Sequence, residues 1–191
     1  MIAPKWEEQV GRALDLAARA WAWVGGLILV GLAGMTVVSV IGRKINAGGI
    51  TGISGDYELV EAGCAIAIFA FLPLCQLRRG HVTVDILTNT FPLALQRFLT
   101  LVGDALVAVV AFVIMWRLYL GVGEKFPFFE QPLRDKLSMG SKPFFPETTY
   151  ELEIQLWIPM MAALVGAVLF FVVAAFTVWR SLNALNAKVA S

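Results

Sequence analysis

Four long apolar runs, almost free of charge, constrain the fold of this chain more than any other feature. They cover residues 20–42, 59–77, 98–120 and 156–179, and each is long enough to cross the hydrocarbon core of a bilayer as a helix. Of the chain's 15 basic and 14 acidic residues, these runs contain only Glu61, Asp104 and Arg117. A membrane imposes such segregation because an ionised side chain in hydrocarbon is costly. We therefore expect an all-α integral membrane protein, a single domain with four transmembrane helices.

The segment before the first run has a different pattern. Trp6, Val10, Leu14 and Ala17 recur at helical spacing, and charged residues occupy the opposite side. The pattern predicts that residues 1–19 form an amphipathic helix that lies in the membrane interface and leads into the first span.

An even number of spans places both termini on the same side of the membrane. If that side is the cytoplasm, it carries eight Lys and Arg residues, the tail 180–191 included. The opposite side carries three, once the long loop 121–155 is set aside. A loop of that length crosses largely regardless of its charge. The positive-inside rule thus predicts cytoplasmic termini, with the loop 121–155 outside.

The reactive side chains are too few for an enzyme or a cofactor protein. His81 is the only histidine, and one intramembrane aspartate does not make the pair of carboxylates of an aspartyl protease. Cys64 and Cys75 form no CxxC motif or metal-ligand cluster. No basic run supplies the footprint that nucleic-acid binding needs. We expect no catalysis, cofactor, metal or nucleic acid.

The charged residues inside the runs are candidates for function. Glu61 lies near the outer start of the second run and Arg117 near the outer end of the third. If consecutive antiparallel spans are neighbours, the two side chains meet at similar depth. We predict an ion pair between them.

Asp104 lies in the inner half of the third run, about 10 Å of helix beyond Arg97 at the boundary. Gln76 and Thr177 in the other runs, and Arg180 directly after the fourth, are the polar residues at that depth. We favour a hydrogen-bonded packing residue over a proton relay.

Small residues recur at four-residue spacing in two of the runs. Gly63 with Ala67 and Ala162 with Gly166 are such pairs. They predict close approach between helices.

Two polar or aromatic segments lie outside the runs. In the inner segment, Arg78 and Arg79 can bind lipid phosphates, and Asp85 follows His81 by about one helical turn, which favours structural anchoring. The outer loop 121–155 is rich in proline and aromatic residues. We expect it to rest on the membrane surface or to dock to a partner.

At these residues the chain resembles the small membrane subunit, the DctQ-type small permease, of tripartite ATP-independent periplasmic (TRAP) transporters. The resemblance rests on Arg43 after the first span, on the acidic helix start Tyr57-Glu58-Leu59, and on the motif Arg79-Gly80-His81-Val82-x-Val84-Asp85. It extends loosely to Ile158-Pro159 at the start of the fourth span. The usual aromatic after Arg43 and the Trp before the acidic start are missing, and the outer loop is long.

The resemblance implies a role in sodium-driven uptake of organic acids across a bacterial inner membrane. In such systems a periplasmic binding protein captures the solute, and a large membrane subunit carries the transport and sodium sites. The small subunit then acts as a fixed scaffold. Implied partner contacts are the inner anchors Arg79, His81 and Asp85, the outer contacts Glu58 and Glu61, and the loop aromatics Phe128, Phe129, Phe144 and Phe145.

Two other functions remain open at the level of sequence. One is an autonomous small transporter of the multidrug type, with Glu61 as a proton-coupled carboxylate. The other is the membrane anchor of a redox complex, with quinone bound near His81. Co-purification with a much larger membrane protein that lacks flavin, haem or iron–sulfur absorbance would favour the scaffold subunit.

Overall fold

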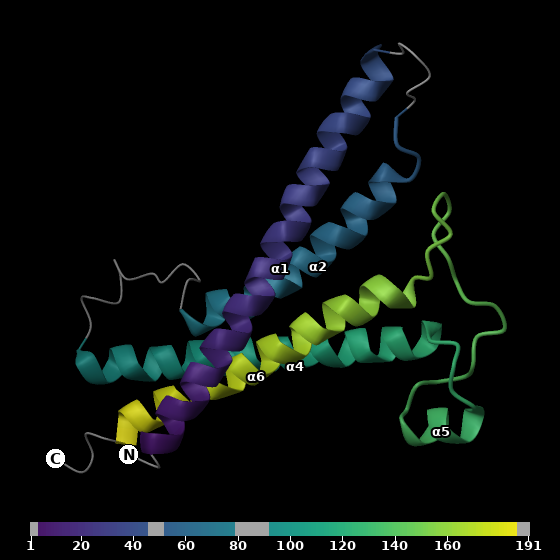
Figure 1. Ribbon diagram of the computed structural model, residues 1–191. Coiled ribbons are helices and arrows are strands. Elements are labelled where there is room, and N and C mark those ends of the chain that lie inside the picture. The colour runs from purple at the N-terminus through teal and green to yellow at the C-terminus, as the bar shows by residue number, and fades with distance from the viewer. Residues whose placement is uncertain (1–3, 46–51, 79–91, 187–191) are drawn as a thin grey trace.

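The computed structural model describes residues 4–45, 52–78 and 92–186, and this part of the chain is mainly helical. The helices are α1 (Pro4–Ile45), α2 (Asp56–Leu77), α4 (Leu93–Lys125), α5 (Gln131–Lys136) and α6 (Trp157–Asn186) (Figure 1). Among the described residues the β pairing is limited to an isolated bridge between Thr148 and Gln155. The predicted all-α fold class is confirmed.

Four of these helices, α1, α2, α4 and α6, are long and apolar enough to cross a membrane. The prediction of four membrane-spanning helices is therefore confirmed. The helices extend beyond the predicted runs: α1 has 42 residues, α4 has 33 and α6 has 30. At 1.5 Å per residue α1 is about 63 Å long, roughly twice the thickness of the hydrocarbon core. Part of α1 must therefore lie outside the hydrocarbon, or the helix must be strongly tilted.

The amphipathic N-terminal segment is continuous with the first span. α1 runs from Pro4 to Ile45 without interruption. In its first turns the side-chain amide of Asn183, on α6, donates a hydrogen bond to Glu7 at 2.9 Å. The start of α1 thus packs beside the end of α6. Its position in the membrane interface stays a prediction.

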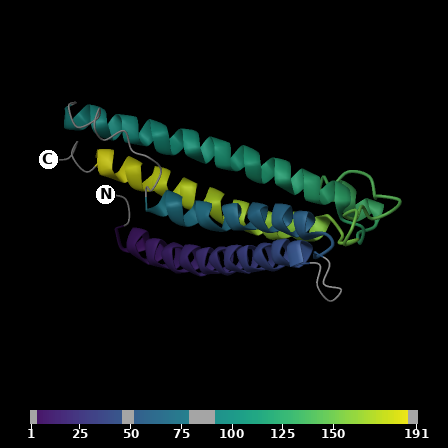
Figure 2. The same cartoon turned by 90° about the horizontal axis from the view of Figure 1, so that it is seen from above.

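The four long helices are stacked in the order α1, α2, α6, α4 (Figure 2). α6 contacts both α2 and α4. Half of the residues in the most apolar stretch of α6 are buried, whereas only 11% are buried in the corresponding stretches of α1 and α4, which lie at the two edges. A cluster of buried apolar residues joins Ala111 of α4 to Phe170 and Ala174 of α6. The last span in the sequence is therefore central in the fold.

Small residues allow the close approach of α2 to both of its neighbours. A Cβ added to Gly166 of α6 would lie 2.5 Å from the carbonyl oxygen of Phe69. A Cβ added to Gly25 of α1 would lie 2.8 Å from the Cβ of Ala70. These distances are shorter than van der Waals contact, so the packing requires glycine. The close approach predicted at Gly166 is confirmed.

The start of α1 and the end of α6 lie at the same end of the stack, which we call the terminal end (Figure 2). α5 and the segment that joins α4 to α6 lie at the opposite end, which we call the loop end (Figure 1). The functional candidates divide between these two ends.

Candidate functional site

Glu58, a predicted partner contact, links the start of α2 to the loop end. One carboxylate oxygen accepts the backbone N–H of Glu151 at 2.8 Å, and the other accepts that of Leu152 at 3.1 Å. The Glu151 carboxylate in turn accepts the N–H of Gly55, the residue before α2. This reciprocal arrangement joins segments more than 90 residues apart in sequence.

The connection between α1 and α2 is closed by a charged contact that the sequence analysis did not identify. Asp56 at the start of α2 forms an ion pair with Arg43 and accepts a hydrogen bond from the Ser39 hydroxyl at 2.7 Å. The Arg43 guanidinium also lies over the ring of Tyr57, 5.7 Å from its centroid. Arg43 and Asp56 stand on either side of a short connection between two helices. This spacing is the sequence feature from which their contact could have been predicted.

The loop end folds around Arg134 of α5, which is fully buried. Its guanidinium donates to the backbone carbonyls of Gly123, Phe126, Met139, Gly140 and Ser141. Five acceptors satisfy the buried donors, as a buried charge requires. The contact joins the end of α4 to the loop. Sequence analysis missed Arg134, because backbone carbonyls leave no residue-type pattern.

The predicted aromatic contacts differ in their surroundings. Phe128 and Phe129 both pack on Phe126, with ring centroids 5.4 and 5.1 Å away, and Phe126 also contacts Trp157 at the start of α6. This aromatic cluster is part of the fold of the loop end.

Phe144 and Phe145 project outward instead. Their rings contact each other with centroids 5.0 Å apart, and the residues are 92% and 75% exposed. Two adjacent exposed aromatics on a folded loop are available to a partner or to the membrane surface. Which of these they contact stays a prediction.

Glu61 and Arg117 do not form the predicted ion pair. Both residues are exposed, on α2 and on α4 respectively. The ion pairs between described residues lie elsewhere: Glu8–Arg12, Asp15–Arg19, Asp56–Arg43 and Glu147–Lys125. The prediction is wrong because it assumed that consecutive spans are neighbours, whereas α6 packs between α2 and α4. Equal depth does not bring the two side chains together.

Asp104 is buried at the interface of α4 with α6. The Ser181 hydroxyl of α6 donates a hydrogen bond to its carboxylate. A second buried hydrogen bond lies nearby in sequence on α6, where Gln76 of α2 donates to the Thr177 hydroxyl at 3.0 Å. Gln76 and Thr177, which we predicted at the depth of Asp104, bond to each other, and the partner Ser181 was not predicted. These contacts are the ones that a packing role requires.

Three predicted anchors, Arg79, His81 and Asp85, lie outside the described residues. Their role stays a prediction. In the part of the chain that the structure describes, no group of three or more His, Cys, Asp or Glu side chains could hold a metal ion.

In this arrangement, polar side chains of the membrane protein form hydrogen bonds between its own helices. Neither a curated protein nor a solved structure matches the chain. The family described as "Tripartite ATP-independent periplasmic transporters, DctQ component" matches residues 32–184, from the first span to the last turns of α6. This match covers most of the chain, takes in the end of the first membrane-spanning helix and the other three, and agrees with the resemblance found in the sequence. The chain therefore belongs to the DctQ component family of tripartite ATP-independent periplasmic transporters.

Proposed function

We propose that this chain is the fixed scaffold subunit of a sodium-driven TRAP transporter that imports organic acids. A periplasmic binding protein delivers the solute, and a large membrane subunit carries the solute and sodium sites. The chain supports that subunit and does no catalysis itself. Family membership supplies the small-subunit assignment, and the remaining steps rest on the arguments below.

The use of the polar groups within the spans is the observation that carries the scaffold role. Asp104, the buried intramembrane acid, bonds to Ser181, and Gln76 bonds to Thr177. A transport site for a sodium ion and a carboxylate needs several convergent oxygens and donors at membrane depth. In the described residues these groups join helices to one another. Such contacts favour a rigid support over a moving carrier.

The two edges of the stack offer surface for the large subunit. Apolar side chains on α1 and α4, such as Leu27, Val30, Leu106 and Val109, are more than 60% exposed within this chain. Lipid tails and the apolar face of another membrane helix are equally hydrophobic, so either can cover these side chains. The exposed acid Glu61 on α2 is a further contact that we assign to the large subunit, because an intramembrane charge requires a partner.

We also propose an orientation in the bacterial inner membrane. The terminal end faces the cytoplasm, because the short segments there carry more Lys and Arg than those at the loop end. Arg79, His81 and Asp85 then anchor the large subunit on the inner side. The loop end faces the periplasm, where Glu58 orders the loop and Phe144 and Phe145 meet the large subunit or the binding protein.

Reconstitution tests the proposal directly. Vesicles are prepared with this chain, a TRAP large subunit and a binding protein, and then with each component omitted. We expect accumulation of a labelled organic acid only with all three and an inward sodium gradient. Accumulation by this chain alone would contradict the scaffold role. Proton-driven efflux by this chain alone, abolished by Glu61→Gln, would favour the multidrug-type transporter.

A further inference from the structure

An open pocket of about 560 Å³ lies at the terminal end, between α1, α2 and α6. Its apolar part is formed by Leu77, the last residue of α2, and by Phe176 of α6. Gly11 of α1 packs against that phenylalanine, since an added Cβ would lie 3.3 Å from its ring. The pocket therefore has an apolar base at the junction of three helices.

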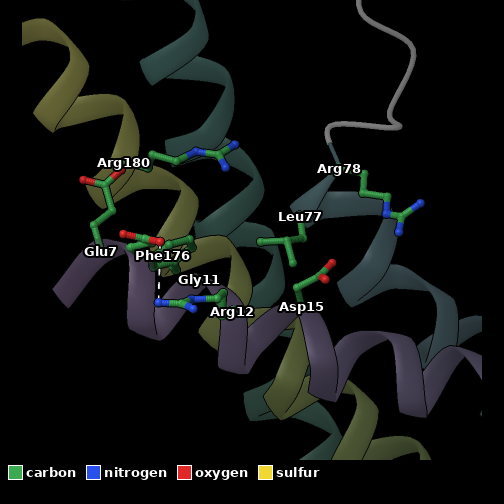
Figure 3. Close-up of a pocket in the computed structure, with 9 residues that line it drawn as sticks. Glu7, Gly11, Arg12, Asp15, Leu77, Arg78, Phe176 and Arg180 are labelled. Atoms are coloured by element: carbon green, nitrogen blue, oxygen red, sulfur yellow. Dashed lines mark ion pairs between the residues drawn. The ribbon is translucent and has the colours of Figure 1, made fainter. Parts of the chain in front are cut away.

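Charged side chains of both signs surround this base. Three acidic residues, Glu7, Glu8 and Asp15, come from α1, and the three arginines, Arg12, Arg78 and Arg180, come from all three helices. In Figure 3 the three guanidinium groups stand on different sides of the pocket, the carboxylate of Asp15 lies between those of Arg12 and Arg78, and Glu7 lies at the edge away from Arg78. The formal charges of the lining cancel.

The partners of these groups divide them further. Glu8 and Arg12 form a 3.5 Å ion pair whose side chains are about three-quarters exposed, and Asp15 pairs with Arg19. Among the described residues, by contrast, the guanidinium groups of Arg78 and Arg180 have no hydrogen-bond or ion-pair partner, and Arg78 bonds only through its backbone N–H at the end of α2. Two arginines from different helices thus present their donors to one pocket. A guanidinium binds phosphate through parallel hydrogen bonds, so a phosphate is the group they suit.

The pocket lies where a lipid headgroup is expected. Arg78 caps the apolar helix α2, and Arg180 follows Trp179, whose amphipathic indole favours the headgroup level. From Arg12, the exposed side of α1 continues with Leu16, Trp23 and Leu27, each about 70% exposed. An acyl chain can lie along these side chains, whereas a water-soluble phosphate cannot use them.

We propose that this pocket binds the headgroup of a phosphatidylethanolamine-type lipid. The phosphate lies with Arg78, and the primary ammonium lies toward Asp15, whose carboxylate stands on the Arg78 side of the pocket in Figure 3. A headgroup that carries one positive and one negative charge complements a lining with no net charge. A purely anionic headgroup is instead repelled by the carboxylates. A primary ammonium also donates hydrogen bonds to carboxylates, which the quaternary ammonium of phosphatidylcholine cannot do.

Native mass spectrometry of the full-length chain in detergent tests the proposal. The protein is titrated with the dioleoyl forms of phosphatidylethanolamine, phosphatidylcholine and phosphatidylglycerol. We expect phosphatidylethanolamine to bind about tenfold more tightly than either other lipid, a difference of one decade in Kd. Equal retention of all three lipids would overturn the proposal.

Variants assign the two halves of the site. Arg78→Gln should weaken phosphatidylethanolamine binding about tenfold, and Arg117→Gln on α4 should leave it unchanged. Asp15→Asn should abolish the preference for phosphatidylethanolamine over phosphatidylglycerol. Unchanged binding by the arginine variant would contradict the phosphate site.

Two further measurements keep the test decisive. If the arginine variant loses its helical circular dichroism, the acidic variant decides, because an unchanged lipid preference there contradicts the proposal. Phosphoethanolamine without acyl chains should compete poorly, and competition equal to that of the whole lipid would assign the site to a free phosphate compound. No transport is measured, so the outcome is independent of the proposed function.

Discussion

Asp104 of α4 and Ser181 of α6 are joined by a buried hydrogen bond, although 77 residues separate them in sequence. The contact belongs to a set of polar side chains on the last turns of α6. Thr177 bonds to Gln76 of α2, and Asn183 bonds to Glu7 of α1. One half of α6 therefore holds each of the other three long helices. This explains how a stack of helices with exposed apolar edges keeps a defined order.

Asp104→Asn should preserve both assembly and transport. The amide keeps an oxygen that can accept the Ser181 hydroxyl, and polar contacts between membrane helices contribute about 0.6 kcal/mol on average. We expect the free energy of unfolding, measured in mixed micelles, to fall by less than about 1 kcal/mol. Ser181→Ala serves as the partner variant, and the two effects should not add. Lost uptake with intact assembly would instead indicate a proton relay at Asp104.

Gly166→Ala should destabilise the protein, whereas Gly34→Ala should stabilise it. Both glycines lie inside long helices, where alanine favours helix by about 1 kcal/mol. At Gly166 a Cβ would lie 2.5 Å from the carbonyl oxygen of Phe69, and at Gly34 it would meet nothing within 4 Å. Opposite signs of the change in unfolding free energy are the expected result. Equal signs would show that α2 and α6 are less closely packed than described.

The number of membrane-spanning helices could be predicted from the sequence, but their order in the stack could not. Charge segregation predicts spans because a bilayer excludes every ionised group in the same way. Which helices pack together depends on the shapes of their surfaces, at positions such as Gly166 against Phe69. Apolar composition does not distinguish one apolar helix face from another. The predicted pair of Glu61 and Arg117 is wrong for this reason, because sequence order was taken for spatial order.

The candidate site was predicted only in part. Glu58 was identified as an acidic helix start, yet its acceptor role toward Glu151 and Leu152 joins segments too distant for a local pattern. Arg134 was missed because its acceptors are backbone carbonyls, which every residue carries. For Asp104 the hydrogen bonding was predicted but its partner Ser181 was not, and the side-chain contact of Arg43 with Asp56 was missed.

Arg134→Gln should unfold the loop end while leaving the long helices intact. The substitution removes donors to buried carbonyls, and each unsatisfied buried group costs about 1–3 kcal/mol. Limited proteolysis and hydrogen exchange of residues 126–156 should both increase. Lys136→Gln, at an exposed position of the same helix, is the matched control and should change neither. An unaltered exchange pattern in the Arg134 variant would contradict the role assigned to the guanidinium.

Glu58→Gln should loosen the contact between α2 and the loop. Each carboxylate oxygen of Glu58 accepts one backbone N–H, and the amide group of glutamine would face one of them with a donor. We expect the free energy of unfolding to fall, because a hydrogen bond to a charged carboxylate is stronger than one to a neutral amide oxygen. Hydrogen exchange at Glu151 and Leu152 is the direct measurement. Glu124→Gln, at an exposed position of α4, should leave these amides protected.

Phe144→Ser with Phe145→Ser should leave the stability of the chain unchanged and weaken its assembly with a partner. Because the two residues are 92% and 75% exposed, their removal should change the free energy of unfolding by less than about 0.5 kcal/mol. If they contact the large subunit or the binding protein, the affinity for that partner should fall about tenfold or more, as at aromatic hot spots. Tyr150→Ser removes an aromatic that is 95% exposed on the same segment and should have no effect on either quantity. Pull-down of each partner by the variant chain distinguishes the two contacts, and full affinity for both partners would leave the membrane surface as the site where these rings lie.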